Sequence, residues 1–261
     1  KGMGESPAMF HAKGYYFMLS SNLTSWEKND NMYHWATSIE GPWHKGGAFC
    51  PEGTLTWNSQ SSYVLPIVNG KDTTFMFMGD RWSYPHQASA ATYVWMPLRI
   101  NGNQVSIPEY WESWSTNSMS PVSLGSLQTR AEGKELQAGD SIVASFQGDP
   151  LYIYGKTDKH SGYARVSVYQ GKERVYSSLI DFYSKNNSEG LRMITPELPI
   201  GNYTLSITCL DDYPVWTDKT KTIYGSDGAK ATVTRIAATP LGNIAYEEDL
   251  KTGGLKSLSI S

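Results

Sequence analysis

A carboxylate among apolar residues stands near the start of the chain. Glu5 lies close in sequence to Met3, Ala8, Met9 and Phe10. Burial among such neighbours would raise the pKa of a carboxyl group, so that it stays protonated near neutral pH and can donate a proton. Spacing alone favours the other interpretation, a solvated glutamate in a terminal loop.

A second group with possible chemistry is Asp80-Arg81, which directly precedes Trp82. A carboxylate beside an arginine could hold the floor of a pocket through charge-assisted hydrogen bonds. The pair could equally be structural within a sheet, and that interpretation is favoured.

Metal chemistry has little support. His86 stands alone in a loop without Cys or His at ligand spacing, and the other histidines show no metal pattern: His11, His34, His44 and His160. Calcium would be compatible with the Gly-rich turns and Asp residues, but no calcium-loop spacing is visible, so no metal and no cofactor is expected. Cys50 and Cys209 cannot form a zinc cluster, and two buried thiols are favoured over one bridge.

The composition excludes several classes of protein. Of the 261 residues, 39% are hydrophobic and 18% charged, which excludes a disordered chain. A net charge of -3 without a basic run argues against nucleic-acid binding. No stretch approaches about 18 apolar residues, so no membrane span is expected. The chain begins at Lys1 without a signal-like stretch, and we therefore expect a processed chain or a piece of a longer one.

Short strands and turns dominate the first 114 residues. Residues 14–19, 74–78 and 92–98 are typical of strands, and Asn101-Gly102-Asn103 of a turn before another strand. No helix-period segment of useful length occurs. This part also holds all the tryptophans but Trp216, which indicates two units of different character. The first unit, 1–114, is predicted to consist of antiparallel sheets like propeller blades.

The second unit has a different pattern. Residues 115–127 are rich in Ser, Thr, Asn and Pro and are predicted to be a linker. Two-residue alternation follows at regular intervals, in 139–146, 150–155, 164–169, 203–208 and 231–236. It predicts a β-sandwich of about 8 strands within 128–261. The tail 241–261 is expected to add a strand or to pack on the first unit. The fold class is therefore all-β.

Five short motifs follow one another in the first unit: Glu5-Ser6-Pro7 leading into the strand 14–21, Asn22-Leu23-Thr24-Ser25-Trp26, Gly41-Pro42-Trp43, Gly79-Asp80-Arg81-Trp82 and Tyr93-Val94-Trp95-Met96-Pro97-Leu98. The five motifs, in this order, resemble those of glycoside hydrolase family 43. The first is similar to its general-acid segment, and the last two resemble the branch of exo-β-1,3-galactanases.

The resemblance implies a five-bladed β-propeller. At roughly 40–50 residues per blade, five blades need more than about 200 residues, so residues 1–114 correspond to the last two to three. The family's catalytic-base Asp and its pKa-modulating carboxylate belong to amino-terminal blades without a counterpart here. Because part of a propeller leaves open edges, we expect upstream blades of the same protein, or a separate segment, to complete the fold.

The resemblance also implies roles for two residues. Glu5 corresponds to the proton donor that glycosidic cleavage requires. Gln60 stands near the position expected for a base in the galactanase-like branch. A neutral amide is a poor base, so it could orient water through its oxygen, act as an imidic tautomer, or only bond a sugar hydroxyl. For inverting hydrolysis we expect Gln60 across a gap of about 6.5–9.5 Å from Glu5, with Trp57 or Trp82 in the wall.

The expected function is exo-acting, inverting hydrolysis of a galactan-type polysaccharide, the β-1,3-galactan of arabinogalactan. The alternatives are an α-L-arabinofuranosidase or β-xylosidase of the same family, or a non-catalytic glycan-binding protein. The predicted substrate-binding residues are Thr24, Trp57, Asn58, Asp80, Arg81 and Trp82, with a structural turn as the other interpretation of Thr24. Family resemblance implies a secreted or periplasmic bacterial protein.

The second unit resembles accessory β-sandwiches of bacterial carbohydrate enzymes, through Asp181-Phe182-Tyr183-Ser184, Gly201-Asn202-Tyr203-Thr204-Leu205 and Tyr224-Gly225-Ser226-Asp227-Gly228. It could bind glycan through Tyr213, Trp216 and Tyr224. A packing module on the side of the propeller is favoured, because a single tryptophan offers little aromatic surface.

Overall fold

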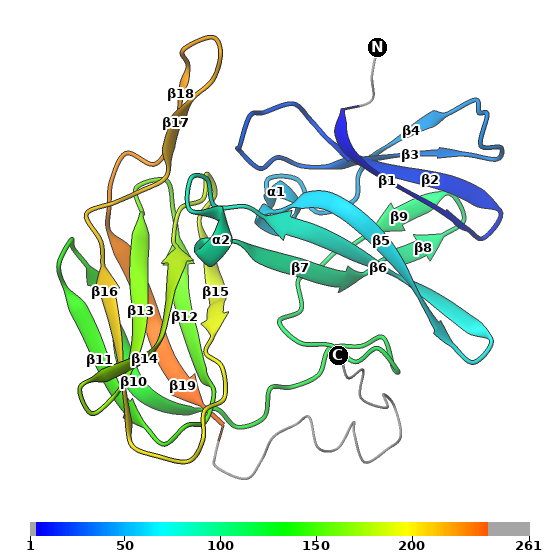
Figure 1. The fold of residues 1–261 in the computed structure, drawn as a ribbon. Coiled ribbons are helices and arrows are strands. Elements are labelled where there is room, and N and C mark those ends of the chain that lie inside the picture. Colours follow the sequence, from blue (N-terminus) through cyan, green and yellow to red (C-terminus); the bar gives the residue numbers. More distant parts are fainter. Residues whose placement is uncertain (1–3, 240–261) are drawn as a thin grey trace.

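The computed structural model describes residues 4–239. Figure 1 shows a chain built almost wholly of strands, with two one-turn helices, α1 (Leu55–Asn58) and α2 (Gln87–Ala90). The all-β prediction is confirmed. Within this part of the chain no helix has the length and apolar character needed to cross a membrane. The predicted role of the tail 241–261 lies outside the described residues.

The first unit begins with two antiparallel sheets. One has four strands in chain order: β1 (Glu5–Ala12), β2 (Tyr15–Ser21), β3 (Met32–Ala36) and β4 (His44–Ala48). The other has three, β5 (Gln60–Asn69), β6 (Asp72–Arg81) and β7 (Thr92–Pro97), and a ribbon of β8 (Arg99–Asn101) and β9 (Gln104–Ser106) follows. Both sheets are meanders, the arrangement of neighbouring propeller blades.

Alternating side chains pack these sheets together. In β1 the small or aromatic residues Ala8, Phe10 and Ala12 point inward, while the residues between them are exposed. They share one core with Phe77 and Val94 of the second sheet. Because alternate residues of a strand point to opposite faces, each sheet covers the other with one face.

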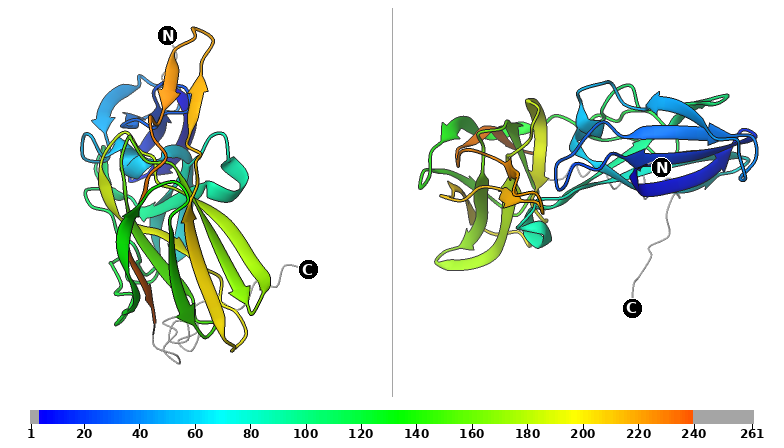
Figure 2. Two further views of the ribbon diagram at one scale, coloured as in Figure 1. Left: turned by 90° about the vertical axis from the view of Figure 1, so that its left-hand side faces the viewer. Right: turned by 90° about the horizontal axis from the view of Figure 1, so that it is seen from above.

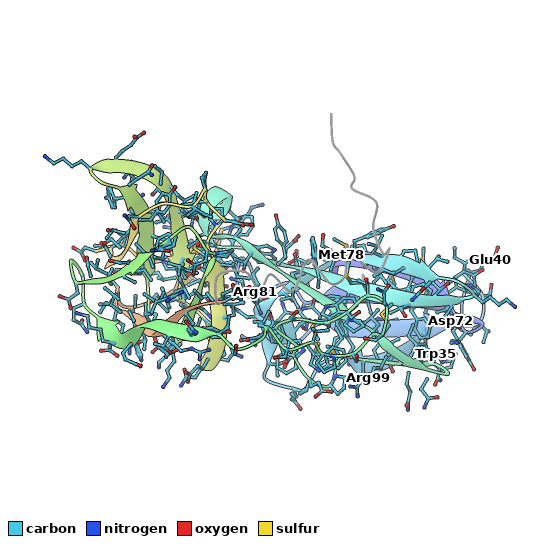
Figure 3. The ribbon with its side chains drawn as sticks, turned by 90° about the horizontal axis from the view of Figure 1, so that it is seen from below. Trp35, Glu40, Asp72, Met78, Arg81 and Arg99 are labelled. Atoms are coloured by element: carbon cyan, nitrogen blue, oxygen red, sulfur yellow. The ribbon has the colours of Figure 1, made fainter. Side chains whose placement is uncertain are left out.

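The other face of the second sheet stays open. Tyr63, Met78 and Trp95 stand opposite one another on β5, β6 and β7, and Figure 3 labels Met78 on this sheet. Tyr63 is 54% exposed, Trp95 51% and the neighbouring Tyr93 63%. The sheets therefore do not close into a ring, which is consistent with a partial propeller.

The predicted linker, residues 115–127, lies between β9 and the first sandwich strand, with an isolated bridge between Trp114 and Pro121. The eight sandwich strands are β10 (Gln128–Leu136), β11 (Ser141–Phe146), β12 (Leu151–Thr157), β13 (Tyr163–Gln170), β14 (Glu173–Asp181), β15 (Ser188–Ile194), β16 (Tyr203–Cys209) and β19 (Ala231–Ala238). They form two antiparallel sheets, β10-β19-β12-β15 and β11-β16-β13-β14.

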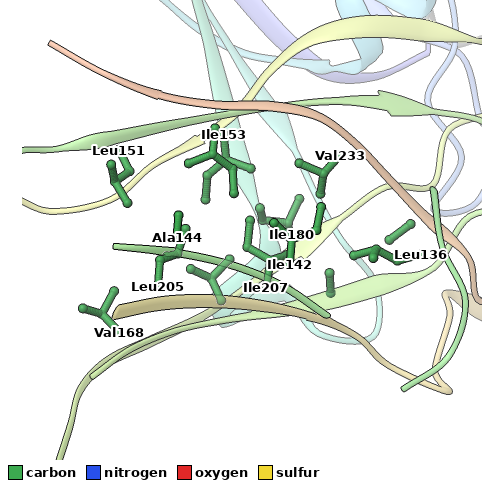
Figure 4. Packing of buried hydrophobic residues seen from close by; sticks show 14 of the residues in the cluster. Leu136, Ile142, Ala144, Leu151, Ile153, Val168, Ile180, Leu205, Ile207 and Val233 are labelled. Atoms are coloured by element: carbon green, nitrogen blue, oxygen red, sulfur yellow. The ribbon is translucent and has the colours of Figure 1, made fainter. Parts of the chain in front are cut away.

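A single apolar core joins the two sandwich sheets. Figure 4 shows Ile142 and Leu205 of one sheet facing Leu151 and Ile153 of the other. In β11 every second residue is buried, which is the alternation that the sequence predicts. Cys209 belongs to this core, and both cysteines are buried free thiols, as predicted.

A hairpin of β17 (Val215–Thr217) and β18 (Ile223–Gly225) extends from the sandwich, and Figures 1 and 2 show it rising past the sandwich sheets next to the first unit. Trp216 of the hairpin donates its Nε1–H to Ser25 Oγ, at 3.1 Å, and lies edge-on to Tyr84. The hairpin therefore connects the two units.

Candidate active site

Glu5 and Gln60 occupy equivalent places in the two sheets of the first unit. Glu5 is the first residue of β1 and Gln60 the first of β5, and these two strands lie against each other. In β1 a register shift between Glu5 and Ala8 coincides with a left-handed residue, Ser6, at a φ of 51°. Irregularities of this kind redirect side chains at strand ends. Here they bring Glu5 and Ser6 together beside Gln60.

The side chain of Gln60 contacts Glu5 directly. Its Nε2 lies 3.1 Å from Glu5 Oε1 and 2.7 Å from Ser21 Oγ, and its Oε1 accepts a hydrogen bond of 2.8 Å from Ser6 Oγ. The predicted gap of about 6.5–9.5 Å is therefore wrong, and no tryptophan lies between the two groups. Both amide atoms of a buried side chain are engaged, so in this arrangement Gln60 orients the Glu5 carboxyl group.

The residues just before Gln60 form a left-handed turn. Each residue of α1 has a φ between 54° and 58°, although none is a glycine. This conformation costs about 1–2 kcal/mol per residue and persists only where surrounding contacts determine it. Thr56 accepts a hydrogen bond of 2.7 Å from Asn31 N, and Leu55 N donates to Asp30 Oδ1 at 2.8 Å. These contacts determine the path of the chain into Gln60.

Arg81 holds the same turn from the second sheet. Its Nε and Nη2 both donate to Trp57 O, at 3.1 and 3.0 Å, and its guanidinium lies over the ring of Tyr110. Trp57 packs against Tyr110 and the core. Arg81 thus has a structural contact, the alternative favoured from the sequence.

The other predicted substrate-binding residues lie in different surroundings. Asp80 pairs with Gln60 in the β5–β6 register. Thr24 donates its hydroxyl to Glu27 O at 2.7 Å and accepts from Asn29 Nδ2 at 2.7 Å, which corresponds to the structural-turn interpretation. Trp82 packs edge-on against Trp26.

Asn58 connects the site with the sandwich. Its Oδ1 accepts a hydrogen bond of 3.1 Å from Ser184 Oγ. His86 lies farther along the same boundary, where its Nε2 is 2.7 Å from Asp212 Oδ2. Among residues 4–239, no three His, Cys, Asp or Glu side chains are grouped as metal ligands would be.

Buried polar groups join the two units. Tyr183 donates its hydroxyl to Glu27 Oε1 at 2.5 Å, and Ser83 donates to Asp181 Oδ2 at 2.8 Å. Lys28, next to Glu27, donates its ammonium group to Trp82 O at 2.6 Å. Burial lowers the pKa of Lys28 and raises that of Asp181, while the charge of each partly opposes the effect on the other. These contacts give the packing interpretation of the sandwich a physical basis.

Sequence reasoning missed several of these residues. Ser6 and Ser21 belong to the motif that identified Glu5 but received no role, although a hydroxyl at a strand end is itself a signal. Glu27 and Lys28 carried no signal, and Asp181 belonged to a motif but received no role, because the contacts of these residues depend on segments far along the chain.

No family model matches the chain, and no curated protein matches it. Solved structures share its fold. A variant exo-β-1,3-galactanase from Phanerochaete chrysosporium with β-1,3-galactotriose gives a TM-score of 0.53 and 19% identity over 90% of this chain. Another variant of this enzyme with the same trisaccharide gives a TM-score of 0.51 at 20% identity, over 90% of this chain. The enzyme with galactose gives a TM-score of 0.50 at 19% identity, also over 90% of this chain.

In all three comparisons the chain spans 56% of the length of the solved protein. The resemblance that the motifs indicated is therefore found in the fold as well.

Proposed function

We propose that this chain is the carboxy-terminal part of a glycoside hydrolase of family 43 that removes galactose from the ends of β-1,3-galactan by inversion. The observation that carries the proposal is the placement of Glu5 beside Gln60, at the starts of β1 and β5. The fold shared with exo-β-1,3-galactanases, whose solved structures contain galactose or β-1,3-galactotriose, supports the choice of sugar.

Glu5 acts as the proton donor in this proposal. Cleavage of a glycosidic bond requires a carboxylic acid that protonates the leaving oxygen and a second group that handles the attacking water. The hydrogen bond from Gln60 holds the carboxyl group of Glu5 in one orientation. Because an amide is a poor base, and because it is engaged with Glu5, we assign Gln60 to positioning the acid.

The second catalytic group then comes from further blades of the same protein, against the open face of the second sheet. The exposed aromatic side chains Tyr63, Tyr93 and Trp95 lie on that face, which a further sheet would cover. Residues 1–114 expressed alone should therefore be insoluble or molten, whereas residues 118–261 should fold better because the sandwich encloses its own core. A cooperative, monomeric 1–114 fragment would contradict this part of the proposal.

The experiment that tests the activity compares three kinds of substrate with the full natural chain: β-1,3-galacto-oligosaccharides, an α-L-arabinofuranoside and a β-xyloside. We expect release of galactose from the first, with the anomer of the product opposite to that of the substrate by NMR. Release of arabinose or xylose instead would favour the related activities. Sugar binding without turnover would favour a glycan-binding protein. The proposed polysaccharide substrate also supports a location in the periplasm or outside the cell.

A further inference from the structure

A cleft of about 450 Å³ lies between the first unit and the sandwich. Its walls come from both: the ends of β6 and β7 on one side, and strands β14 and β15 on the other. Asn58, two residues before Gln60, lines the cleft as well, whereas Glu5 and Gln60 do not. We call it the interdomain cleft. It is a separate space that reaches the neighbourhood of the candidate active site.

Two guanidinium groups line the interdomain cleft, Arg81 from β6 and Arg192 from β15. Figure 3 shows Arg81 at the junction of the two units. Burial and then the charge of Arg81 lower the pKa of Arg192 to about 10, against the opposing charges of Glu112 and Asp181. A cation that is both desolvated and close to another cation is a favourable partner for an anion.

Local backbone geometry directs Arg192 into this position. The register between β12 and β15 shifts so that Leu191 and Met193 have partners on β12 while Arg192 has none. Such a bulge on an edge strand redirects a side chain.

The carboxylates of the cleft are already engaged. Glu112 Oε1 accepts a hydrogen bond of 2.9 Å from Leu191 N, and Asp181 accepts from Ser83 Oγ and from Tyr183 N, each at 2.8 Å. Among the residues that the structure describes, Arg192 has one hydrogen bond, from Nε to Gly190 O at 3.2 Å. A guanidinium group has five N–H donors, so donor capacity remains on the cleft side.

We propose that the interdomain cleft binds a sugar residue that carries a carboxylate, with Arg192 as its main charged contact. The aromatic ring of Tyr110 and the side chain of Met193 provide apolar wall, which suits the faces of a pyranose ring. Guanidinium groups match the planar carboxylate in charge and geometry. The sugar part of this proposal rests on the proposed function, whereas the charge part rests on the cleft.

The test is calorimetric titration of the full natural chain, in its Glu5→Gln form, with methyl β-D-glucuronide, methyl β-D-galactoside and sodium sulfate. We expect the glucuronide to bind more tightly than the other two. Arg192→Gln should weaken its binding about tenfold or more, because a charged hydrogen bond is lost. Arg192→Lys should retain part of the affinity.

Arg165→Gln is the matched control, because Arg165 is an exposed arginine of the other sandwich sheet. It should leave binding unchanged, and unaltered melting temperatures would show that each variant folds. The proposal would be overturned if the glucuronide and the galactoside bound equally well or if neither bound. It would also be overturned if Arg192→Gln left the affinity for the glucuronide unchanged. Sulfate binding as tight as the glucuronide would overturn its sugar part. Because binding is read without turnover, a protein that fails to hydrolyse galactan but binds the glucuronide would contradict only the proposed function.

Discussion

The amide nitrogen of Gln60 lies 3.1 Å from Glu5 Oε1, although the two residues are 55 positions apart in the chain. An amide that donates to a carboxyl oxygen restricts its rotation and leaves the other oxygen free to carry the proton. With Ser6 and Ser21 bonded to the same amide, Gln60 has little freedom to turn toward a water on the far side of a sugar. The contact therefore favours a role for Gln60 in orienting the acid Glu5 over a role as the catalytic base.

Gln60→Glu should therefore change the pH dependence of the reaction. A second carboxylate in contact with Glu5 disfavours ionisation of both, so the pair retains a proton to higher pH. We expect the alkaline limb of the kcat/KM profile to move upward by about one pH unit or more. Gln60→Ala, the control without a charge, should lower kcat and should move that limb less than Gln60→Glu does. A Gln60→Glu protein with the wild-type profile, or with a higher rate, would instead favour a base in this position.

Arg81→Met should destabilise the fold by about 1–3 kcal/mol, because two hydrogen bonds to Trp57 O and a cation–aromatic contact are lost. Urea unfolding measures this. Arg99, also labelled in Figure 3, is the matched control, since it too lies over an aromatic ring, that of Trp111, but its hydrogen bond is to the exposed carboxylate of Glu109. Arg99→Met should cost about 1 kcal/mol or less. Equal costs for the two variants would mean that Arg81 does not hold the turn.

The contact between Tyr183 and Glu27 should couple the stability of the two units. Glu27 is buried, and without the tyrosine hydroxyl its Oε1 keeps one hydrogen bond, of 3.3 Å from Gly225 N. Tyr183→Phe and Glu27→Gln should each destabilise by about 1–3 kcal/mol. The double variant should cost less than the sum, by about 1 kcal/mol or more. Additive costs in this double-mutant cycle would show that the two groups do not interact.

Sequence patterns predicted the strands that bury alternate apolar residues, such as β11, and failed where other features dominate. β10 is rich in charged residues and has a glycine at position 133, so its pattern does not indicate a strand. The structure gives the reason for the glycine: a Cβ at Gly133 would come within 2.1 Å of Val233 O on the paired strand β19. Such a close approach depends on a partner far along the chain.

The candidate site, like the strands, was predictable from the sequence only in part. The motifs brought Glu5 and Gln60 to attention together, but the distance between them depends on a bulge at Ser6 and a left-handed turn at residues 55–58 that no propensity predicts. The charged residues at the interface resemble ordinary surface residues in the sequence. Their burial follows from contacts such as Tyr183 with Glu27, which are 156 positions apart.

The most direct test of the account is the rate of galactose release from a β-1,3-galacto-oligosaccharide by the full natural chain, compared with its Glu5→Gln variant. Loss of a proton donor with little change in shape should lower the rate about 10²- to 10⁴-fold, with an unchanged melting temperature. An aryl galactoside with an activated leaving group should be less affected, because its departure needs less protonation. A Glu5→Gln protein that cleaves the natural oligosaccharide at a near-normal rate would contradict the central claim that Glu5 is the acid.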